Sequence, residues 1–526
     1  MKQTRQGAGV ARFAGGWPMA GLLAVALLPL GAGAQERVPG DSAAPARTAL
    51  IEGLPRPRYA ASPLLPPDHW AVRAAHRAEA LGLADGYLPA QRAVPRAQVE
   101  TALRAAAERT AGSALAPVAA EWHARFVAEF PEYREGADAL PVAPLGWTLG
   151  AGYALAKGRV APAQGGETPA ALPDRWGWGV HAMPAVRVGR WLAAYGEVRQ
   201  GAGPGVEPRW NVVAGAGAFA LSAGSETEAY GVGRGGGIVY SGTEPLPRVE
   251  LSTTRALRLP GVLGRAGGVS MHTFVSRTAG EREPGRPWLW GARLAVQPHR
   301  RLTVAVNRGS MFGGPPGDPV TARNLARMLV GAIRTNFENQ MVSVDVRYRV
   351  PSERLLPAVA YLEWGADDGA GAFTDVPGQV AGVFLPALPG LDRVALGAEV
   401  ARFGPPGDGN GPWYRHNLFY GNWARGDALL GHPLGGEGTE ASVYGEAELP
   451  GGRLRVDARG FGRRRSATGQ PSNILGPSRL GRSTGGEVEV LWRAWRSLEL
   501  AAGVAGENGD GWRERRASAE VRVLPW

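Results

Sequence analysis

The sequence predicts an all-β transmembrane barrel of about 18 antiparallel strands, preceded by a small α-helical periplasmic domain. Two observations predict this fold. Strands with one apolar and one charged face recur along the C-terminal part of the chain, and no apolar run of membrane-spanning length follows the N-terminal segment. Glycine (78) and proline (43) are abundant among the 526 residues, as many short strands joined by turns require.

The stretch Val342–Val350 (VSVDVRYRV) shows the strand pattern most clearly. Apolar residues alternate with Ser343, Asp345, Arg347 and Arg349, so the period is two residues. A soluble sandwich would turn the valines toward a core, whereas an outer-membrane barrel would turn them toward lipid and the charges toward the lumen. Because charges of both signs recur strand after strand, we expect the barrel, with arginine–carboxylate pairs lining its lumen.

The same alternation returns at Val443–Leu449, Leu454–Phe461 and Ala517–Val523. We place the barrel at residues 145–526, where roughly 380 residues allow roughly 16 to 18 strands at about 10 residues per strand plus loops. The last residue, Trp526, resembles the terminal aromatic signal read by the barrel assembly machinery, which is therefore an expected partner. The alternative is chance, since the chain has 17 tryptophans.

The first 34 residues have the order of a secretory signal peptide. Three basic side chains and no acidic one precede the apolar run Met19–Leu30, and the small residues Ala32-Gly33-Ala34 follow it. The run is too short to span a bilayer comfortably, so we expect cleavage after Ala34 and not a membrane anchor. Residues 35–62, rich in proline and alanine without a sustained period, are interpreted as a linker.

Residues 63–140 are predicted to form the helical domain. Apolar residues recur at helical spacing in 70–81, in Pro95–Ala111 and in Pro117–Phe130, with Asp68 as the expected N-cap of the first helix. Within it, residues 69–103 resemble one S-layer homology repeat, on the pieces His69-Trp70, Leu81-Gly82-Leu83 and Asp85-Gly86-Tyr87. That resemblance implies contact with cell-wall polymer. The alternative is a helical domain packed on the periplasmic side of the barrel.

Composition and spacing exclude several classes of function. The formal net charge is +11, but the basic residues are spread along strands, so we expect acidic glycans or lipopolysaccharide as partners and no nucleic acid. With no cysteine there is no disulfide, zinc knuckle or cysteine nucleophile. The eight histidines show no metal-ligand spacing and no Gly-x-Ser-x-Gly elbow occurs, so we expect no enzyme, no cofactor and no metal.

One stretch combines aromatic faces, which stack on sugar rings, with charged groups that bind hydroxyls and carboxylates. We predict it as the polysaccharide-binding site, and the alternative is an aromatic girdle at the membrane interface. Its residues are Trp413, Tyr414, Arg415, His416, Tyr420, Trp423 and Arg425.

Three further stretches carry weaker signals. Thr321–Gly331 is predicted to be a short helix inside a loop, either a constriction in the lumen or a surface element. Asp367, Asp368 and Asp375 form an acidic loop without the spacing of a calcium loop. Gly231–Gly236 resembles a phosphate loop superficially, but a glycine-rich hairpin explains it.

Six segments stand in a characteristic order along the chain, namely Trp176-Gly177-Trp178-Gly179, Trp290–Leu294, Phe312-Gly313-Gly314, Asp345–Tyr348, Tyr361–Asp368 and residues 416–434. Taken in this order, they resemble the capsule assembly protein Wzi family of outer-membrane barrels. The family pattern has a carboxylate where Ala366 stands.

This resemblance implies an outer-membrane barrel of about 18 strands with a lectin-like, non-catalytic role. Such a protein would bind or retain capsular or surface polysaccharide and take part in capsule assembly, as a monomer surrounded by outer-membrane lipid. Two alternatives remain open. A porin or substrate-specific channel needs an open lumen, and a barrel tethered to the cell wall needs the S-layer-like segment to bind polymer.

Overall fold

The computed structural model describes residues 56–524, apart from 89–92, 135, 138–141, 158–175, 203–207, 278–286, 314–316, 332–336, 353–355, 368–376, 405–412, 417–420, 426–427 and 466–479. All described residues belong to the compact unit Ala49–Trp526. The predicted signal peptide, most of the predicted linker and Trp526 lie outside the described residues.

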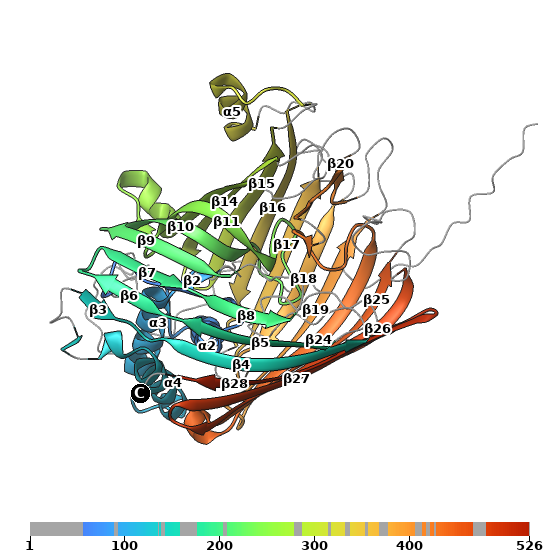
Figure 1. Ribbon diagram of the computed structural model, residues 1–526. Coiled ribbons are helices and arrows are strands. Elements are labelled where there is room, and N and C mark those ends of the chain that lie inside the picture. Colours follow the sequence, from blue (N-terminus) through green and yellow to red (C-terminus); the bar gives the residue numbers. More distant parts are fainter. Residues whose placement is uncertain are drawn as a thin grey trace, which may run out of the picture. The chain divides into compact units, whose positions relative to one another are not determined.

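One antiparallel sheet closes on itself around a lumen (Figure 1), with β28 pairing back onto β4. Within the described residues 22 strand segments belong to this barrel. Four of them continue the preceding segment after a short break, namely β4 after β3, β6 after β5, β8 after β7 and β12 after β11. Counting each such pair as one strand gives 22 − 4 = 18 strands. The predicted barrel is therefore confirmed, although the number of separate strand segments, 22, is larger than the predicted number of strands, about 18.

The barrel segments share antiparallel pairing with their neighbours. Their bounds are β3 (Val142–Pro144), β4 (Thr148–Lys157), β5 (Trp176–Met183), β6 (Ala185–Val188), β7 (Leu192–Gly196), β8 (Val198–Ala202), β9 (Trp210–Ala216), β10 (Phe219–Ala229), β11 (Ser241–Thr253), β12 (Leu257–Arg258), β13 (Gly268–Arg277), β14 (Trp288–His299), β15 (Leu302–Phe312), β16 (Glu338–Arg349), β17 (Val359–Asp367), β18 (Gly378–Leu385), β19 (Val394–Phe403), β24 (Gly438–Glu448), β25 (Leu454–Arg465), β26 (Gly481–Trp495), β27 (Leu498–Gly509) and β28 (Trp512–Val523).

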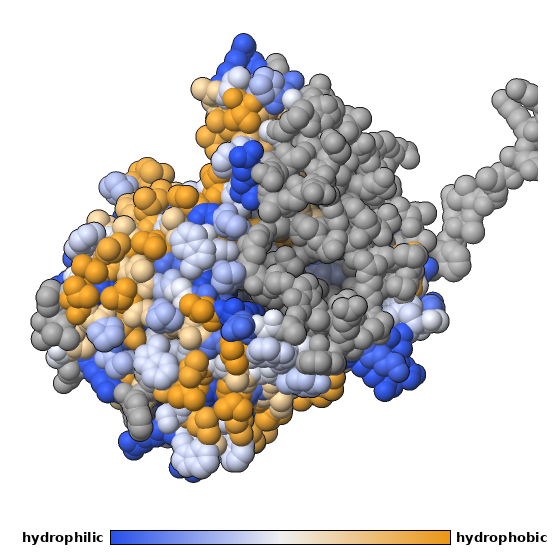
Figure 2. All heavy atoms as spheres, in the orientation of Figure 1, coloured by the Kyte–Doolittle hydropathy of each residue, from blue (hydrophilic) through white to orange (hydrophobic). Residues whose placement is uncertain are grey.

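Strand β16 shows how sequence alternation becomes two faces of the wall. Val342, Val344 and Val346 are partly exposed, whereas Ser343 and Asp345 between them are fully buried. Large apolar side chains on other strands are likewise exposed, and Figure 2 shows apolar residues spread over the outer surface of the molecule. This is the inverse of a soluble sandwich, because the apolar side chains point outward and the charged ones point into the interior. The predicted orientation of this strand is confirmed.

Three helices pack against one another at one end of the barrel (Figure 1): α2 (Trp70–Ala80), α3 (Arg96–Arg109) and α4 (Ala116–Glu129). Their apolar stripes meet in a core that contains Trp70, Leu103, Trp122, Phe126 and Phe130. The N-cap of α2 is His69, whose side chain accepts a hydrogen bond from the Ala71 amide at 3.2 Å. The predicted cap, Asp68, was therefore wrong by one residue. A short 3-10 turn, η1 (Pro131–Tyr133), follows α4.

Smaller elements complete the fold. Helix α5 (Ala322–Leu329) begins at its N-cap Thr321 and projects beyond the strand ends, as Figure 1 shows. None of the described helices is long and apolar enough to cross a membrane. Among the described residues, two-stranded sheets outside the barrel are formed by β1 (Leu64–Leu65) with β2 (Val94–Pro95), β20 (Arg415–His416) with β21 (Gly421–Asn422), and β22 (Ala424–Arg425) with β23 (Ala428–Leu429).

Candidate functional site: a filled lumen

The inner wall of the barrel pairs arginines with carboxylates across neighbouring strands. Arg293 of β14 binds Asp345 of β16 through two nitrogens, one of them at 3.2 Å, and Asn307 of β15 donates to the same carboxylate at 2.8 Å. Glu440 of β24 accepts from both Arg459 and Arg463 of β25. Buried charges persist in proteins when they are paired in this way. The arginine–carboxylate lining predicted from the strand pattern is therefore present.

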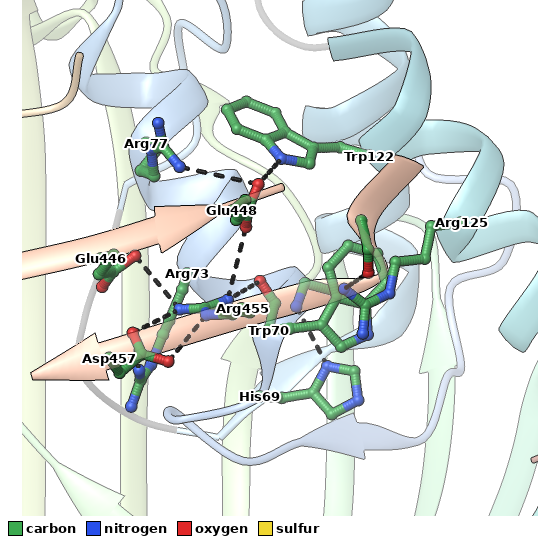
Figure 3. Close-up of polar contacts among 12 residues, drawn as sticks. His69, Trp70, Arg73, Arg77, Trp122, Arg125, Glu446, Glu448, Arg455 and Asp457 are labelled. Carbon is green, nitrogen blue, oxygen red and sulfur yellow. Dashed lines mark hydrogen bonds and ion pairs between the residues drawn. The ribbon is translucent and has the colours of Figure 1, made fainter. Parts of the chain in front are cut away.

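The helical end of the lumen is organised around Arg455 of β25, as Figure 3 shows. Its guanidinium lies 2.8 Å from Asp457 and 3.2 Å from Glu446, and it donates to the Trp70 carbonyl of α2 at 3.3 Å. Arg73 of α2 binds Asp457 as well, at 2.6 Å. Strand and helix thus share one network of buried charges, which fixes the position of α2 inside the wall.

The helices bind side chains and backbone groups of strands on several sides of the barrel. Glu79 binds Arg347 of β16 at 2.7 Å, Gln98 donates to the Thr253 carbonyl of β11 at 2.8 Å, and Arg125 binds Glu499 of β27 at 3.0 Å. Strands β11, β16 and β27 are widely separated around the barrel. The three helices therefore span the lumen from wall to wall.

Burial and neighbouring charges at the helical end change the pKa values of ionisable side chains on the helices. Burial alone would raise the pKa of Glu129, but the charge and hydrogen bond of His69, together with Arg493, hold that pKa well below its usual range. Burial and the neighbouring charge of Arg493 together lower the pKa of Arg125 to about 10, although the charge of Glu499 opposes them. Burial, with the charges of Arg347, Arg234 and Arg73, lowers the pKa of His76 to about 3. His76 is therefore neutral at neutral pH.

From the other end, the connection between β10 and β11 folds into the lumen. We call residues 230–240 the inward loop. The backbone amides of Arg234 and Gly235 donate to Glu399 of β19 at 2.6 and 2.8 Å, and the amide of Ile238 donates to Glu363 of β17 at 3.2 Å. Gly237 approaches the chain so closely that a Cβ there would overlap the carbonyl oxygen of Tyr230. The glycine-rich stretch is thus an inward loop that binds carboxylates of the wall, and not a phosphate loop.

The inward loop reaches the helices. Val232 belongs to the same buried cluster as Ala80 of α2, and Arg234 lies 3.1 Å from Glu446, the carboxylate that also binds Arg455. Tyr361 and Tyr444 of the wall belong to this cluster as well, with their hydroxyl oxygens 3.2 Å apart. Helices from one end and the loop from the other therefore meet inside the barrel and fill its centre.

The predicted polysaccharide-binding residues divide into two groups. Trp413, Tyr414 and Trp423 are 2%, 0% and 0% exposed, so they offer no free ring face to a sugar. The Tyr414 hydroxyl donates to the Ile238 carbonyl at 2.7 Å, and the Trp423 indole nitrogen donates to the Val239 carbonyl at 2.9 Å. These aromatic side chains hold the inward loop, together with Tyr240, Phe274 and Phe403.

The second group is not described at the level of side chains. Arg415 and His416 lie on β20 and Arg425 lies on β22, and the side chains of all three, like the whole of Tyr420, are outside the described residues. Their role in binding stays a prediction.

The structure also describes the predicted short helix in Thr321–Gly331 and part of the predicted acidic loop. In α5 only Met328 is buried, so this helix is the surface element and the constriction interpretation was wrong. Asp367 accepts a hydrogen bond from the Tyr414 amide at 2.8 Å, whereas Asp368 and Asp375 lie outside the described residues.

Sequence reasoning missed the carboxylates that hold the inward loop. Glu363 is on the same face of its strand as Tyr361, and Glu399 is the one acidic residue of β19. Strand alternation alone would have placed both in the lumen. No local pattern, however, says which loop would come to meet them.

A closed antiparallel barrel with a charged interior, filled by helices and a loop, defines a plugged β-barrel protein. A family model described as capsule assembly protein Wzi matches residues 211–512, more than half of the chain, so the chain belongs to the Wzi family. The match begins beyond the helices, and the resemblance of residues 69–103 to an S-layer homology repeat receives no support from it.

Among solved structures, the chain is similar to Wzi of Escherichia coli, described as an outer-membrane protein involved in group 1 capsule assembly and a carbohydrate-binding β-barrel. The TM-score is 0.69 at 15% identity, over 88% of this chain and 100% of that chain, so the likeness shows the shared fold. OprD of Pseudomonas aeruginosa gives a TM-score of 0.44 at 11% identity, over 72% of this chain and 93% of that chain, and no argument rests on it. The comparison with curated proteins gave no match.

Proposed function

We propose that this protein is an outer-membrane, lectin-like barrel that binds or retains capsular or related surface polysaccharide and takes part in capsule assembly without catalysing a reaction. The observation that carries the proposal is the filled lumen, in which Arg455 of the wall and the helix residue Arg73 share Asp457. A barrel closed in this way suits a surface receptor, because its rigid wall presents loops without needing a path for solutes. Membership of the Wzi family and the described carbohydrate binding of the Escherichia coli protein support the same conclusion.

For the binding surface, we propose the segment that contains β20 to β23. Its buried aromatic residues Trp413, Tyr414 and Trp423 would fix the base of the segment against the inward loop. Arg415, His416, Tyr420 and Arg425 would then be the contact groups, with the two guanidinium groups binding sugar carboxylates in bidentate fashion.

The proposed location follows from the outer face of the wall. Apolar residues such as Val306, Val400 and Val443 point outward and are 45%, 52% and 62% exposed, as lipid-facing positions require. Cleavage of the signal peptide after Ala34, a periplasmic position for the helices, assembly through Trp526 and a monomeric state belong to the same proposal.

Retention of polysaccharide by the purified, folded full chain tests this function. We expect it to bind purified group 1 capsular polysaccharide and to ignore neutral dextran of matched length. Replacing Arg415 and Arg425 together by alanine should weaken binding by at least tenfold. As the matched control, Arg323→Ala changes an exposed arginine of α5 and should leave binding unchanged. Failure of the unmodified protein to bind any acidic polysaccharide would contradict the function, and equal binding by the double variant would contradict the proposed surface.

One observation favours the porin alternative. Glu487 of β26 lies opposite the inward-facing Arg459 in the strand register of β25 and β26. Glu487 is nevertheless exposed, so water reaches this part of the inner wall. A channel protein would conduct ions past this residue. Single-channel conductance in a planar bilayer distinguishes the two functions.

A further inference from the structure

Three buried side chains converge on the inner wall at the base of the inward loop. Glu228 of β10, Glu250 of β11 and His272 of β13 are 1%, 2% and 2% exposed. The Nε2 atom of His272 lies 3.1 Å from Glu250 Oε1 and 3.5 Å from Glu228 Oε2, and the three ligand atoms lie within 4.8 Å of one another. They come from three adjacent strands, so the barrel and not a local sequence motif brings them together.

These distances between ligand atoms are close to those found between the ligands of one bound metal ion. Ligand atoms bound tetrahedrally to zinc at about 2.0–2.1 Å are separated by roughly 3.3 Å. A histidine nitrogen and two carboxylate oxygens are ligands that zinc accepts, with a fourth position left for water.

The histidine gives a second, independent indication. Its Nε2 atom has no hydrogen-bond partner among the described residues, although a carboxylate oxygen lies 3.1 Å away. The ring is therefore not aligned for donation to that oxygen. Its other nitrogen, Nδ1, is 2.7 Å from the Tyr230 hydroxyl. Metal-binding histidines are oriented in this manner, with one nitrogen on the ion and the other anchored by a polar partner.

The charge balance at the cluster also admits a cation. Glu228 and Glu250 bring two carboxyl groups, and Arg248, 3.5 Å from Glu228 and 3.0 Å from Glu250, brings one positive charge. With both carboxylates ionised, the formal sum is −2 + 1 = −1. Uncompensated charge in a buried site is costly, which favours the ion.

We propose that Glu228, Glu250 and His272 bind a divalent first-row transition ion, for which zinc is the probe, and that this ion fixes the point where the inward loop leaves the wall. The register of β10 with β11 shifts between Thr227 and Ala229, so Glu228 sits in this irregularity. Tyr230, which anchors His272, is the first residue of the inward loop. An ion here would tie three strands and the root of the loop together.

Metal retention by the full chain tests the proposal. The protein is refolded in detergent with zinc chloride or with a chelator, freed of unbound metal, and analysed by inductively coupled plasma mass spectrometry. We expect about one zinc per chain after refolding with zinc, and its loss in His272→Ala. His181→Ala is the matched control, because His181 is also buried and lies 3.6 Å from a single carboxylate, that of Glu520. This control should retain the zinc.

Two further measurements keep the test decisive if His272→Ala does not fold. Cobalt bound to the unmodified protein should show the visible absorption of a four-coordinate nitrogen and oxygen site. Tyr230→Phe, which removes only the anchor of the histidine, should weaken zinc binding by about tenfold or more. Absence of retained zinc and cobalt in the folded unmodified protein would overturn the proposal, as would equal retention by His272→Ala. Neither result depends on polysaccharide binding, so the metal site and the proposed function fail separately.

Discussion

The two ends of the lumen are closed by different physical means. At the helical end, charged side chains of α2 and α4 bind charged side chains of the wall, as in Arg73–Asp457 and Arg125–Glu499. At the opposite end, the inward loop is held mainly through backbone amides on Glu399 and Glu363 and through packed aromatic rings. The first closure depends on complementary charges. The second depends on shape, because the loop fits only where glycines allow close approach.

The largest effect should come from the charge network at the helical end. Arg455→Ala would leave Glu446, Glu448 and Asp457 close together without their central cation. Removing one partner of a buried ionic network typically costs about 3–5 kcal/mol. We expect a loss of this size in the free energy of unfolding in detergent, with faster tryptic cleavage of the helices. Arg464→Ala, an exposed position on the same strand, should change neither quantity.

The inward loop should respond to a change of shape. In Gly237→Ala the new methyl group overlaps the Tyr230 carbonyl, so the loop must shift at a cost of about 1–3 kcal/mol. We expect increased ion conductance in planar bilayers while the helices stay resistant to trypsin. A Cβ at Gly462 would meet nothing within 4 Å, so Gly462→Ala is the matched control. Conductance equal to that of the unmodified protein would mean that the loop does not contribute to closure.

A smaller effect is expected where the loop meets the aromatic cluster. Trp423→Phe keeps an aromatic ring but loses the hydrogen bond to the Val239 carbonyl. A buried hydrogen bond of this kind contributes about 1 kcal/mol. A loss of about 1 kcal/mol corresponds to a roughly fivefold increase in the hydrogen-exchange rate of the inward-loop amides. Unchanged exchange would show that Trp423 does not stabilise the loop.

The smallest effect should appear on acidification at the helical end. The pKa of His76 is about 3 in the folded protein, below its ordinary value of 6.5, so the unfolded chain binds the proton first. Stability from neutral His76 is therefore present above pH 6.5 and declines as the pH falls toward 3. Because His76 is partly exposed, we expect about 1 kcal/mol between pH 6.5 and 5.

The unfolding free energy, followed over this window, tests the role of His76. The lowered pKa of Glu129 contributes only below its ordinary value of 4.5, so it does not interfere. An identical pH slope in His76→Gln would contradict the account.

Sequence reasoning succeeded where a pattern is local. The period of two at Val342–Val350 predicted an outward apolar and an inward charged face, and β16 has both. The helical spacing after Trp70 predicted α2, although its cap was misplaced by one residue. These predictions hold because periodicity reports directly on which side of an element is buried.

Sequence patterns are less informative where distant segments meet. Aromatic residues that suit sugar stacking suit a buried cluster equally well, and Trp413 and Tyr414 proved to be buried because the inward loop covers them. Likewise, Glu228, Glu250 and His272 stand 22 residues apart along the chain, on separate strands, so no ligand spacing could point to them. Only the register of the closed barrel brings such residues together.

We infer that the helices and the inward loop together close the lumen. Single-channel conductance of the purified, folded full chain in a planar bilayer tests this closure most directly. We predict no steady conductance in the unmodified protein, because the charge network around Arg455 and the loop at Glu399 fill the interior. Stable current steps that scale with salt concentration would contradict a closed lumen and would identify the protein as a channel.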